Sequence, residues 1–189
     1  GHLHGAKTFH QNGYSKNNQC LGKPYRLKYT LENNQWVADK SNPASVNVMG
    51  NADKFVRYAF SLRYFNDKHE DITGQIVNGG EDQHYQHFFT VSDVKPSYGG
   101  VEEKSDGNHP DFFQYTYCDT KPWDKTVHFD NAAFLDANNP IGIKGFFTFL
   151  RSRKQFTLNI RLMRAHQSKR VGDKPSPFYA PSSQQEAKE

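Results

Sequence analysis

Two histidines three residues apart, beside two acids, form the stretch of this sequence that most resembles a metal-binding motif. Residues 79–89 read GGEDQHYQHFF, with His84 and His87 in the second half. Neutral imidazoles bind zinc and other transition metals. Residues i and i+3 point to opposite faces of a β-strand, however, and the apolar alternation around these histidines predicts a strand. We therefore expect His87 on the apolar face, and His84 beside Gln86 on the polar face or in a groove.

A second group of histidines lies in the first ten residues, GHLHGAKTFH. In an extended chain His2 and His4 share a face, and His10 follows nearby. If maturation left His2 as the N-terminal residue, its free amine and imidazole would form a copper chelate. That arrangement resembles the copper brace of the polysaccharide monooxygenases at this one position, and it implies none of that family's other roles. A copper-, zinc- or haem-binding protein that uses these three histidines, with His84 or His87, is one functional hypothesis.

Catalytic signatures are absent from the sequence. It contains no G-x-S-x-G, H-E-x-x-H, P-loop or dinucleotide-binding glycine motif. Acidic residues are frequent in the expected loops, but a glycosidase needs two carboxyl groups roughly 5–10 Å apart, and spacing in sequence does not show which pair converges. We therefore favour a binding protein over an enzyme.

The pattern of apolar residues predicts an all-β chain. Aromatic residues make up 14% of the 189 residues, and strands with alternating apolar positions are separated by turn signals at short intervals. The expected fold is an antiparallel β-sandwich, jelly-roll-like, with about nine or ten strands over residues 24–166. Residues 1–23 are expected to form a polar arm, and residues 167–189 an extended tail rich in Pro, Ser and Gln.

Some segments carry sharper expectations. Residues 25–32, YRLKYTLE, alternate cleanly and predict a half-buried strand, followed by a turn at ENNQ and a returning strand at WVAD. Residues 84–94 predict another strand. A strand is also expected at ITGQIV, residues 72–77. Residues 141–163 predict a terminal hairpin that turns at RSRK.

Basic residues are concentrated near the C-terminal end. Residues 137–172 hold eight lysines and arginines and no acid, although the chain as a whole has a net charge of only +4. We expect an anion-binding surface for an anionic polymer or an acidic partner. The alternative is a solvated hairpin whose charges prevent edge aggregation. Nucleic acid is a less favoured partner, because no RNA-recognition motif accompanies the charge. The residues expected to bind anions are Arg151, Arg153, Lys154, Arg161 and Arg164.

Aromatic residues in or beside loops suggest a carbohydrate site, because exposed rings can stack on sugars. The expected ligand-binding residues are Trp36, Tyr98 and Trp123, together with His84 and Gln86. The alternative is that these rings cap the ends of the core. The tail, residues 171–189, contains PSPFYAP, a segment that could insert Phe178 and Tyr179 into a neighbouring copy.

Three functions therefore stay open. The first is a non-catalytic module of a secreted, periplasmic or cell-surface protein that binds a glycan or a similar polar or anionic ligand. The second is a structural self-assembling protein, coat-like or inclusion-like, that uses its arm and tail. The third is the metal- or haem-binding protein described above. No run of 18 apolar residues predicts a membrane span, and whether Cys20 and Cys118 form a disulfide stays open.

Overall fold

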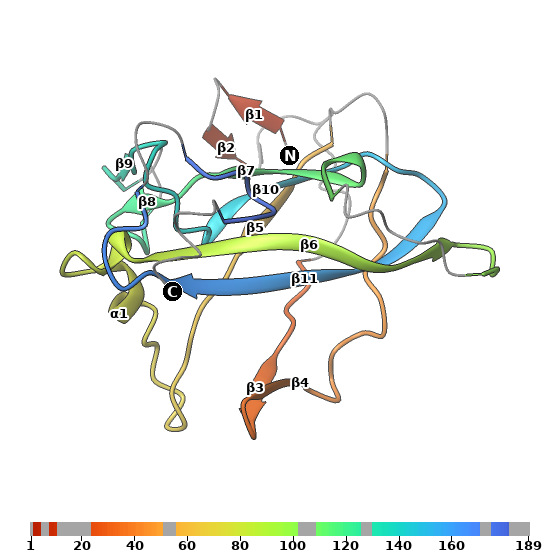
Figure 1. Ribbon diagram of the computed structural model, residues 1–189, viewed down its shortest axis with the longest axis horizontal. Helices are drawn as coiled ribbons and strands as arrows, with labels where there is room; N and C mark the ends of the chain where they lie inside the picture. The colour runs from red at the N-terminus through yellow and green to blue at the C-terminus, as the bar shows by residue number, and fades with distance from the viewer. Residues whose placement is uncertain are drawn as a thin grey trace.

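The computed structural model describes residues 2–4, 8–10, 24–50, 56–101, 109–125, 130–170 and 175–181 (Figure 1). Most of the expected N-terminal arm, Cys20 and the last eight residues lie outside this set. Within the described residues no helix is both long and apolar enough to cross a membrane.

The centre of the fold is a three-stranded antiparallel sheet. Its order is β5 (Tyr58–Ser61), β10 (Lys144–Phe149) and β7 (Phe113–Tyr117), so β10 is paired on both sides. Strand β10 reads KGFFTF and is buried along nearly its whole length, as expected for the middle strand of a sheet covered on both faces. Gly145 is required there, because a Cβ at this position would collide with the ring of Tyr115.

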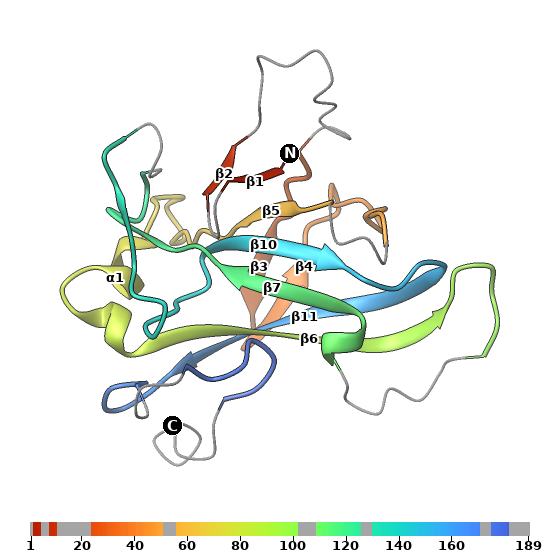
Figure 2. The ribbon, with the colours of Figure 1, turned by 90° about the horizontal axis from the view of Figure 1, so that it is seen from above.

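A long two-stranded ribbon forms a second layer. It consists of β6 (Tyr85–Pro96) and β11 (Lys154–Arg164), which pair antiparallel with a register shift between Gln155 and Thr157. The sequence prediction of a strand at residues 84–94 is confirmed. Figure 1 shows the ribbon running beneath the central sheet along the long axis, and Figure 2 shows the same elements from above.

The hydrophobic core fills the space between these two layers. Phe89 is completely buried. It packs edge-on against Phe147, with ring centroids 5.2 Å apart, and its ring is tilted against that of Tyr115, with centroids 4.0 Å apart. Each fully buried aromatic side chain contributes about 1.5–3 kcal/mol through the area removed from water. The buried members of this cluster come from three strands and are Phe89, Val91, Val94, Phe113, Tyr115, Phe147 and Phe149.

The predicted terminal hairpin is wrong. Strands β10 and β11 are consecutive in the chain but belong to different layers. Both edges of β10 are already occupied by β5 and β7, so β11 can only pair elsewhere, and it pairs with β6. The connection uses Arg153 in a left-handed conformation, with φ 58°.

Short elements complete the described chain. Residues expected to form a strand at 72–77 instead contain the one-turn helix α1 (Gly74–Val77), which begins after Asp71 accepts the backbone N–H of Thr73. The remaining elements are the 3₁₀ turns η1 (Glu81–Gln83) and η2 (His109–Asp111), and the antiparallel pairs β1 (His2–His4) with β2 (Thr8–His10), β3 (Tyr29–Glu32) with β4 (Gln35–Ala38), and β8 (Thr120–Lys121) with β9 (Ala133–Phe134).

The protein is therefore mostly β, with short strands in small antiparallel sheets. The expected fold class holds at that level, and no closed sandwich or jelly roll is formed by the described residues.

Candidate functional site

The hairpin β3–β4 is built by its own sequence. Asn33 and Asn34 both have positive φ, 49° and 62°, which is the backbone of the tight two-residue turn that joins antiparallel strands with the correct twist. Asparagine tolerates this conformation better than most residues. At the open end of the hairpin, the side chain of Asn42 donates to the carbonyl of Lys28 and accepts its N–H.

One face of this hairpin is apolar and exposed. Leu31 lies directly opposite Trp36, and Tyr29 opposite Ala38, so these four side chains share a face. Trp36 is 59% exposed, Leu31 54% and Tyr29 53%. Tyr25 and Leu27, with the same parity on the chain leading into β3, are exposed as well. We call Tyr25, Leu27, Tyr29, Leu31, Trp36 and Ala38 the apolar hairpin face.

The prediction that residues 25–32 form a half-buried strand is therefore wrong about burial. Every residue of β3 and β4 is exposed, although the alternation is that of a strand with one covered face. Trp36 contacts the rest of the chain at Tyr64, with ring centroids 6.4 Å apart. In Figure 1 the hairpin extends away from the two layers.

The exposed area of this face is comparable with the largest apolar patch of an ordinary monomer. The exposed parts of the five large side chains on the apolar hairpin face sum to on the order of 500 Å², given that an aromatic side chain presents about 150–250 Å². The largest apolar patch of an ordinary monomer is about 300–600 Å² and is often functional. A two-stranded hairpin is also only marginally stable by itself in water. This face is therefore a candidate binding surface.

The buried carboxylate of Asp119 fixes the backbone of the segment that leads into β10. Asp119 accepts four consecutive backbone N–H groups, from residues 141–144, at 2.8–3.1 Å. Burial raises the pKa of Asp119, while these donors and Lys169 act to lower it. Each carboxylate oxygen accepts two N–H groups, which is the hydrogen-bonding pattern of the ionised form.

Lys169 and His87 are buried beside this segment. The Lys169 ammonium donates to the carbonyls of Tyr85 and Pro140, and burial lowers its pKa to about 7. Nδ1 of His87 lies 2.8 Å from the carbonyl oxygen of Ile141, so it carries the proton, and Nε2 accepts the hydroxyl of Tyr64 at 2.8 Å. Burial lowers the pKa of His87 to about 4. These groups are satisfied within the fold, so we assign them a structural role.

The predicted metal-binding histidines lie in different parts of the fold. His87 lies inside the core, and His84 Nδ1 lies within hydrogen-bonding distance of the carbonyls of Ala165 and Gln167. His2 pairs with His10 across β1 and β2. Where the structure describes the chain, no group of three or more histidine, cysteine or acidic residues is placed to hold a metal ion.

The loop aromatics predicted to bind sugar lie on separate elements. Trp36 lies on β4, Tyr98 is exposed in the loop after β6, and Trp123 follows β8 with the guanidinium of Arg63 5.3 Å from its ring centroid. Figure 1 places the loop after β6 and strand β8 toward opposite ends of the long axis. Gln86, predicted with them, is buried and donates to the hydroxyl of Tyr117.

The predicted anion-binding residues are distributed along β11. Arg151, Arg153 and Lys154 lie where the chain enters the strand, and Arg161 and Arg164 lie toward its end. An eleven-residue strand is about 35 Å long, so the two groups cannot contact one small anion. Arg151 pairs with Asp111 and Arg164 with Glu81, each at 3.8 Å.

Part of the expected tail belongs to the core of its own chain. The backbone N–H of Phe89 donates to the carbonyl of Phe178 at 2.8 Å, and the ring of Phe178 packs on Phe113 with centroids 5.2 Å apart. Residues 171–174 and 182–189 of the predicted docking tail lie outside the described residues.

Comparison of the chain with protein-family models, with curated proteins and with solved structures finds no match.

Proposed function

We propose that this protein is a structural subunit that self-assembles through the apolar hairpin face. The observation that supports this proposal is that the apolar alternation of β3–β4 predicts a covered face, whereas the side chains of that face are exposed. The sequence alternates as in a strand with one covered face, yet Tyr29, Leu31 and Trp36 are more than half exposed. A partner surface would remove these side chains from water, which is the dominant favourable term in association.

The partner is a second copy of the chain. The charged residues of the hairpin and its lead-in, Arg26, Lys28 and Glu32, all have the opposite parity to the apolar face. Two copies can therefore face each other without burying like charges, although the chain carries a net charge of +4. Docking of the two faces would bury about 1,000 Å² in total, which places a dimer formed by this face alone in the weak class of interfaces.

The proposal includes the sandwich expected from the sequence. The β5–β10–β7 sheet and the β6–β11 ribbon share one hydrophobic cluster, and we take them as the two layers of a small antiparallel sandwich. The β3–β4 hairpin is then an appendage of this sandwich that packs on a neighbouring copy.

Sedimentation velocity across a wide range of protein concentrations tests the proposal. The wild type should form species heavier than the 21.7 kDa monomer as concentration rises. The double variant Leu31→Ser/Trp36→Ser should remain monomeric, and the control Thr30→Ser/Val37→Ser, on the opposite face of the same hairpin, should assemble like the wild type. A wild type that stays monomeric at all concentrations would refute the proposal.

A second candidate is glycan binding by the same face. It is supported by the exposed rings of Tyr29 and Trp36 on one face of the hairpin, and by the exposed ring of Tyr25 in the segment that leads into β3. Leucines between the rings favour protein contact instead, because an aliphatic side chain offers no flat π-surface for a sugar. Co-sedimentation with insoluble cellulose, chitin and xylan distinguishes the two. Binding lost in Trp36→Ala, from a wild type that stays monomeric, would establish the glycan function in place of assembly.

A further inference from the structure

Strand β11 has a free edge along the ribbon. Within the described residues it pairs with β6 and with no other strand. The backbone N–H of Ala165 donates to the carbonyl of His84 at 2.9 Å, in the register of the β6–β11 ladder. Main-chain groups alternate in direction along a strand. Odd-numbered residues of β11 therefore direct these groups toward β6, and Leu158, Ile160 and Leu162 direct them toward the free side.

The hydrogen bonds of β6 support this assignment. Phe89 lies opposite Ile160 in the ladder, yet its N–H donates to the carbonyl of Phe178 at 2.8 Å, on the other side of β6. Opposite residues of an antiparallel ladder exchange both of their main-chain bonds or neither. Ile160 is therefore not bonded to Phe89, and its N–H and C=O groups lie at the outer edge of the ribbon.

The middle of this edge lacks the features that usually protect an edge strand, which are Pro, Lys and β-bulges. The register shift lies between Gln155 and Thr157, near the beginning of the strand. Residues 157–163 read TLNIRLM and contain no Pro, Gly, Lys or acid. Ile160 and Leu162 are 41% and 36% exposed. This stretch is therefore an apolar, weakly charged template for another strand.

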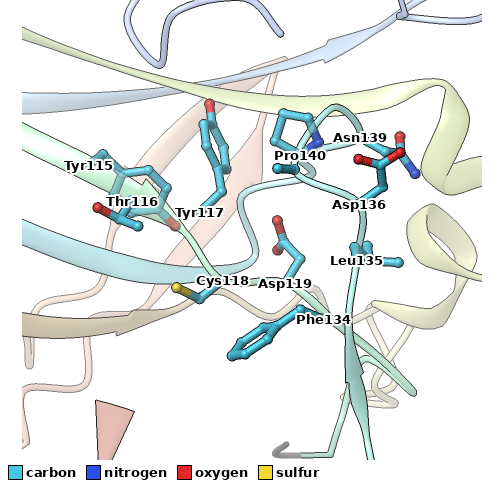
Figure 3. A pocket seen from close by; sticks show the side chains of 11 residues that line it. Tyr115, Thr116, Tyr117, Cys118, Asp119, Phe134, Leu135, Asp136, Asn139 and Pro140 are labelled. Carbon is cyan, nitrogen blue, oxygen red and sulfur yellow. The ribbon is translucent and has the colours of Figure 1, made fainter. Parts of the chain in front are cut away.

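Strand β7 also lies at the edge of its sheet, but its free side is less suited to docking. Residues 134–140 lie alongside residues 115–119 there, and the two segments line a cavity of about 240 Å³ (Figure 3). The chain that continues β7 is already paired, with Thr120 opposite Phe134. The edge of β11 is therefore the better candidate for an added strand.

The sequence of β11 matches an antiparallel copy of itself. A two-fold axis at Ile160 places Leu158 of one copy opposite Leu162 of the other, and the two Ile160 residues opposite each other. All of these residues direct their main-chain groups toward the free side, so they would form the hydrogen-bonded pairs of the new ladder. Their aliphatic side chains would then pack together on one face.

Charge selects this register. Arg161 is the only charged residue in the stretch TLNIRLM, and it would lie opposite Asn159 of the second copy. Nδ2 of Asn159 donates to Ser92 Oγ at 3.0 Å, so its Oδ1 is the atom that can accept a guanidinium N–H. Centring the pair on Arg161 would oppose two arginines, and centring it on Asn159 would oppose Lys154 and Arg164.

We propose that β11 pairs with β11 of a second copy as an antiparallel strand centred on Ile160, which joins the two ribbons into one four-stranded sheet. The choice of partner rests on the proposed self-assembly and on the self-complementary sequence. About six main-chain hydrogen bonds form, with little buried area, so this contact joins subunits that the apolar hairpin face already holds in pairs. With two separate contacts, each subunit assembles beyond a dimer.

Sedimentation velocity on charge variants tests the contact. The wild type should form species larger than a dimer. Asn159→Arg introduces a charge opposite Arg161 of the second copy, so it should remain dimeric up to about tenfold higher concentration. Asn159→Asp introduces an opposite charge and should form the larger species at lower concentration. Gln155→Arg adds the same charge as Asn159→Arg at an exposed position outside the paired stretch, and it should assemble like the wild type.

The outcomes separate this contact from the hairpin contact. A wild type that stops at the dimer, or Asn159→Arg that assembles like the wild type, would overturn the β11 contact and leave the hairpin contact intact. A wild type that stays monomeric would overturn both. Urea unfolding establishes that each variant keeps the wild-type stability, as expected for the exposed positions 155 and 159.

Amide exchange resolved by residue gives a second readout. In the assembled wild type, the amides of Ile160 and Leu162 should exchange more slowly than in monomeric Trp36→Ser, because they gain partners across the new ladder. The amide of Arg161 is directed toward β6 and should change little. Equal exchange of Ile160 and Leu162 in the two proteins would contradict pairing at this edge.

Discussion

Asp119 holds four residues of backbone in place with a single carboxylate. The segment it binds, residues 141–144, turns sharply at Gly142, whose φ is +87°. A Cβ there would lie 2.9 Å from side-chain atoms of both His87 and Tyr117. The close approach lets the carbonyl of Ile141 accept the backbone and ring N–H groups of His87. One acid thus sets the geometry around the buried histidine.

Replacement of Asp119 by asparagine should destabilise the fold strongly. An amide has one acceptor oxygen and introduces two donors, so buried N–H groups of residues 141–144 would lose their partners. We expect a loss of about 3 kcal/mol in the free energy of unfolding, measured with urea. The control Asp124→Asn removes an exposed acid 3.8 Å from Lys125 and should change the free energy by about 0.5 kcal/mol or less. Equal effects of the two variants would contradict the role of Asp119.

The buried imidazole of His87 predicts a loss of stability in acid. Its pKa is lowered from 6.5 to about 4 in the folded chain, so the unfolded chain binds more protons between these two values. Stability should therefore decline as pH falls from 6.5 toward 4, by about 3 kcal/mol from this residue. Glutamine cannot take up the proton. The stability advantage of the wild type over His87→Gln, measured by urea unfolding, should shrink across that range, and a constant difference would refute the assignment.

For single residues, the sequence predicts the burial of some side chains and gives no signal for others. Alternation around His87 was enough to place it on the apolar side of a strand, and the structure confirms that it is buried. Asp119 gives no comparable signal, because its four donors are 22 to 25 residues away in the chain and none is marked by a motif. Gln86 is predicted on the polar face or in a groove, but it is buried and its side-chain amide donates to the hydroxyl of Tyr117.

The secondary-structure elements show the same division between local and non-local information. The turn at Asn33 and Asn34 and the alternation of β3 were predictable, because both depend on neighbouring residues. Which face is covered depends on a partner surface that periodicity does not specify. The sequence also could not predict that β11 pairs with β6 and not with β10. This pairing depends on β5 and β7 occupying both edges of β10, which is non-local information.

The C-terminal segment 175–181 should contribute to the stability of the core. Phe178 packs on Phe113 and is partly buried. Phe178→Ala should lower the free energy of unfolding by about 2 kcal/mol, somewhat less than for a fully buried phenylalanine. Phe65→Ala, at an exposed phenylalanine, should have little effect. If the two variants were equally stable, the segment would not be part of the core.

For the whole molecule, the two layers supply a core, and the hairpin supplies an apolar surface that the described residues leave exposed. The layers share the cluster of Phe89, Tyr115 and Phe147, whereas Trp36 is mostly exposed. Loss of Trp36 should therefore leave the stability of the monomer within about 1 kcal/mol of the wild type, as is usual for surface positions, while abolishing assembly. Urea unfolding at low concentration, compared with sedimentation at high concentration, checks this separation. Assembly of Trp36→Ser at the wild-type concentration would contradict it.

The measurement that tests assembly most directly is hydrogen–deuterium exchange as a function of protein concentration. Strand β7 lies in the core sheet and serves as the internal reference. If the apolar hairpin face docks on a second copy, amides of residues 29–38 should exchange more slowly as concentration rises, while those of residues 113–117 stay constant. Exchange of residues 29–38 that is equally fast at every concentration would contradict the central claim.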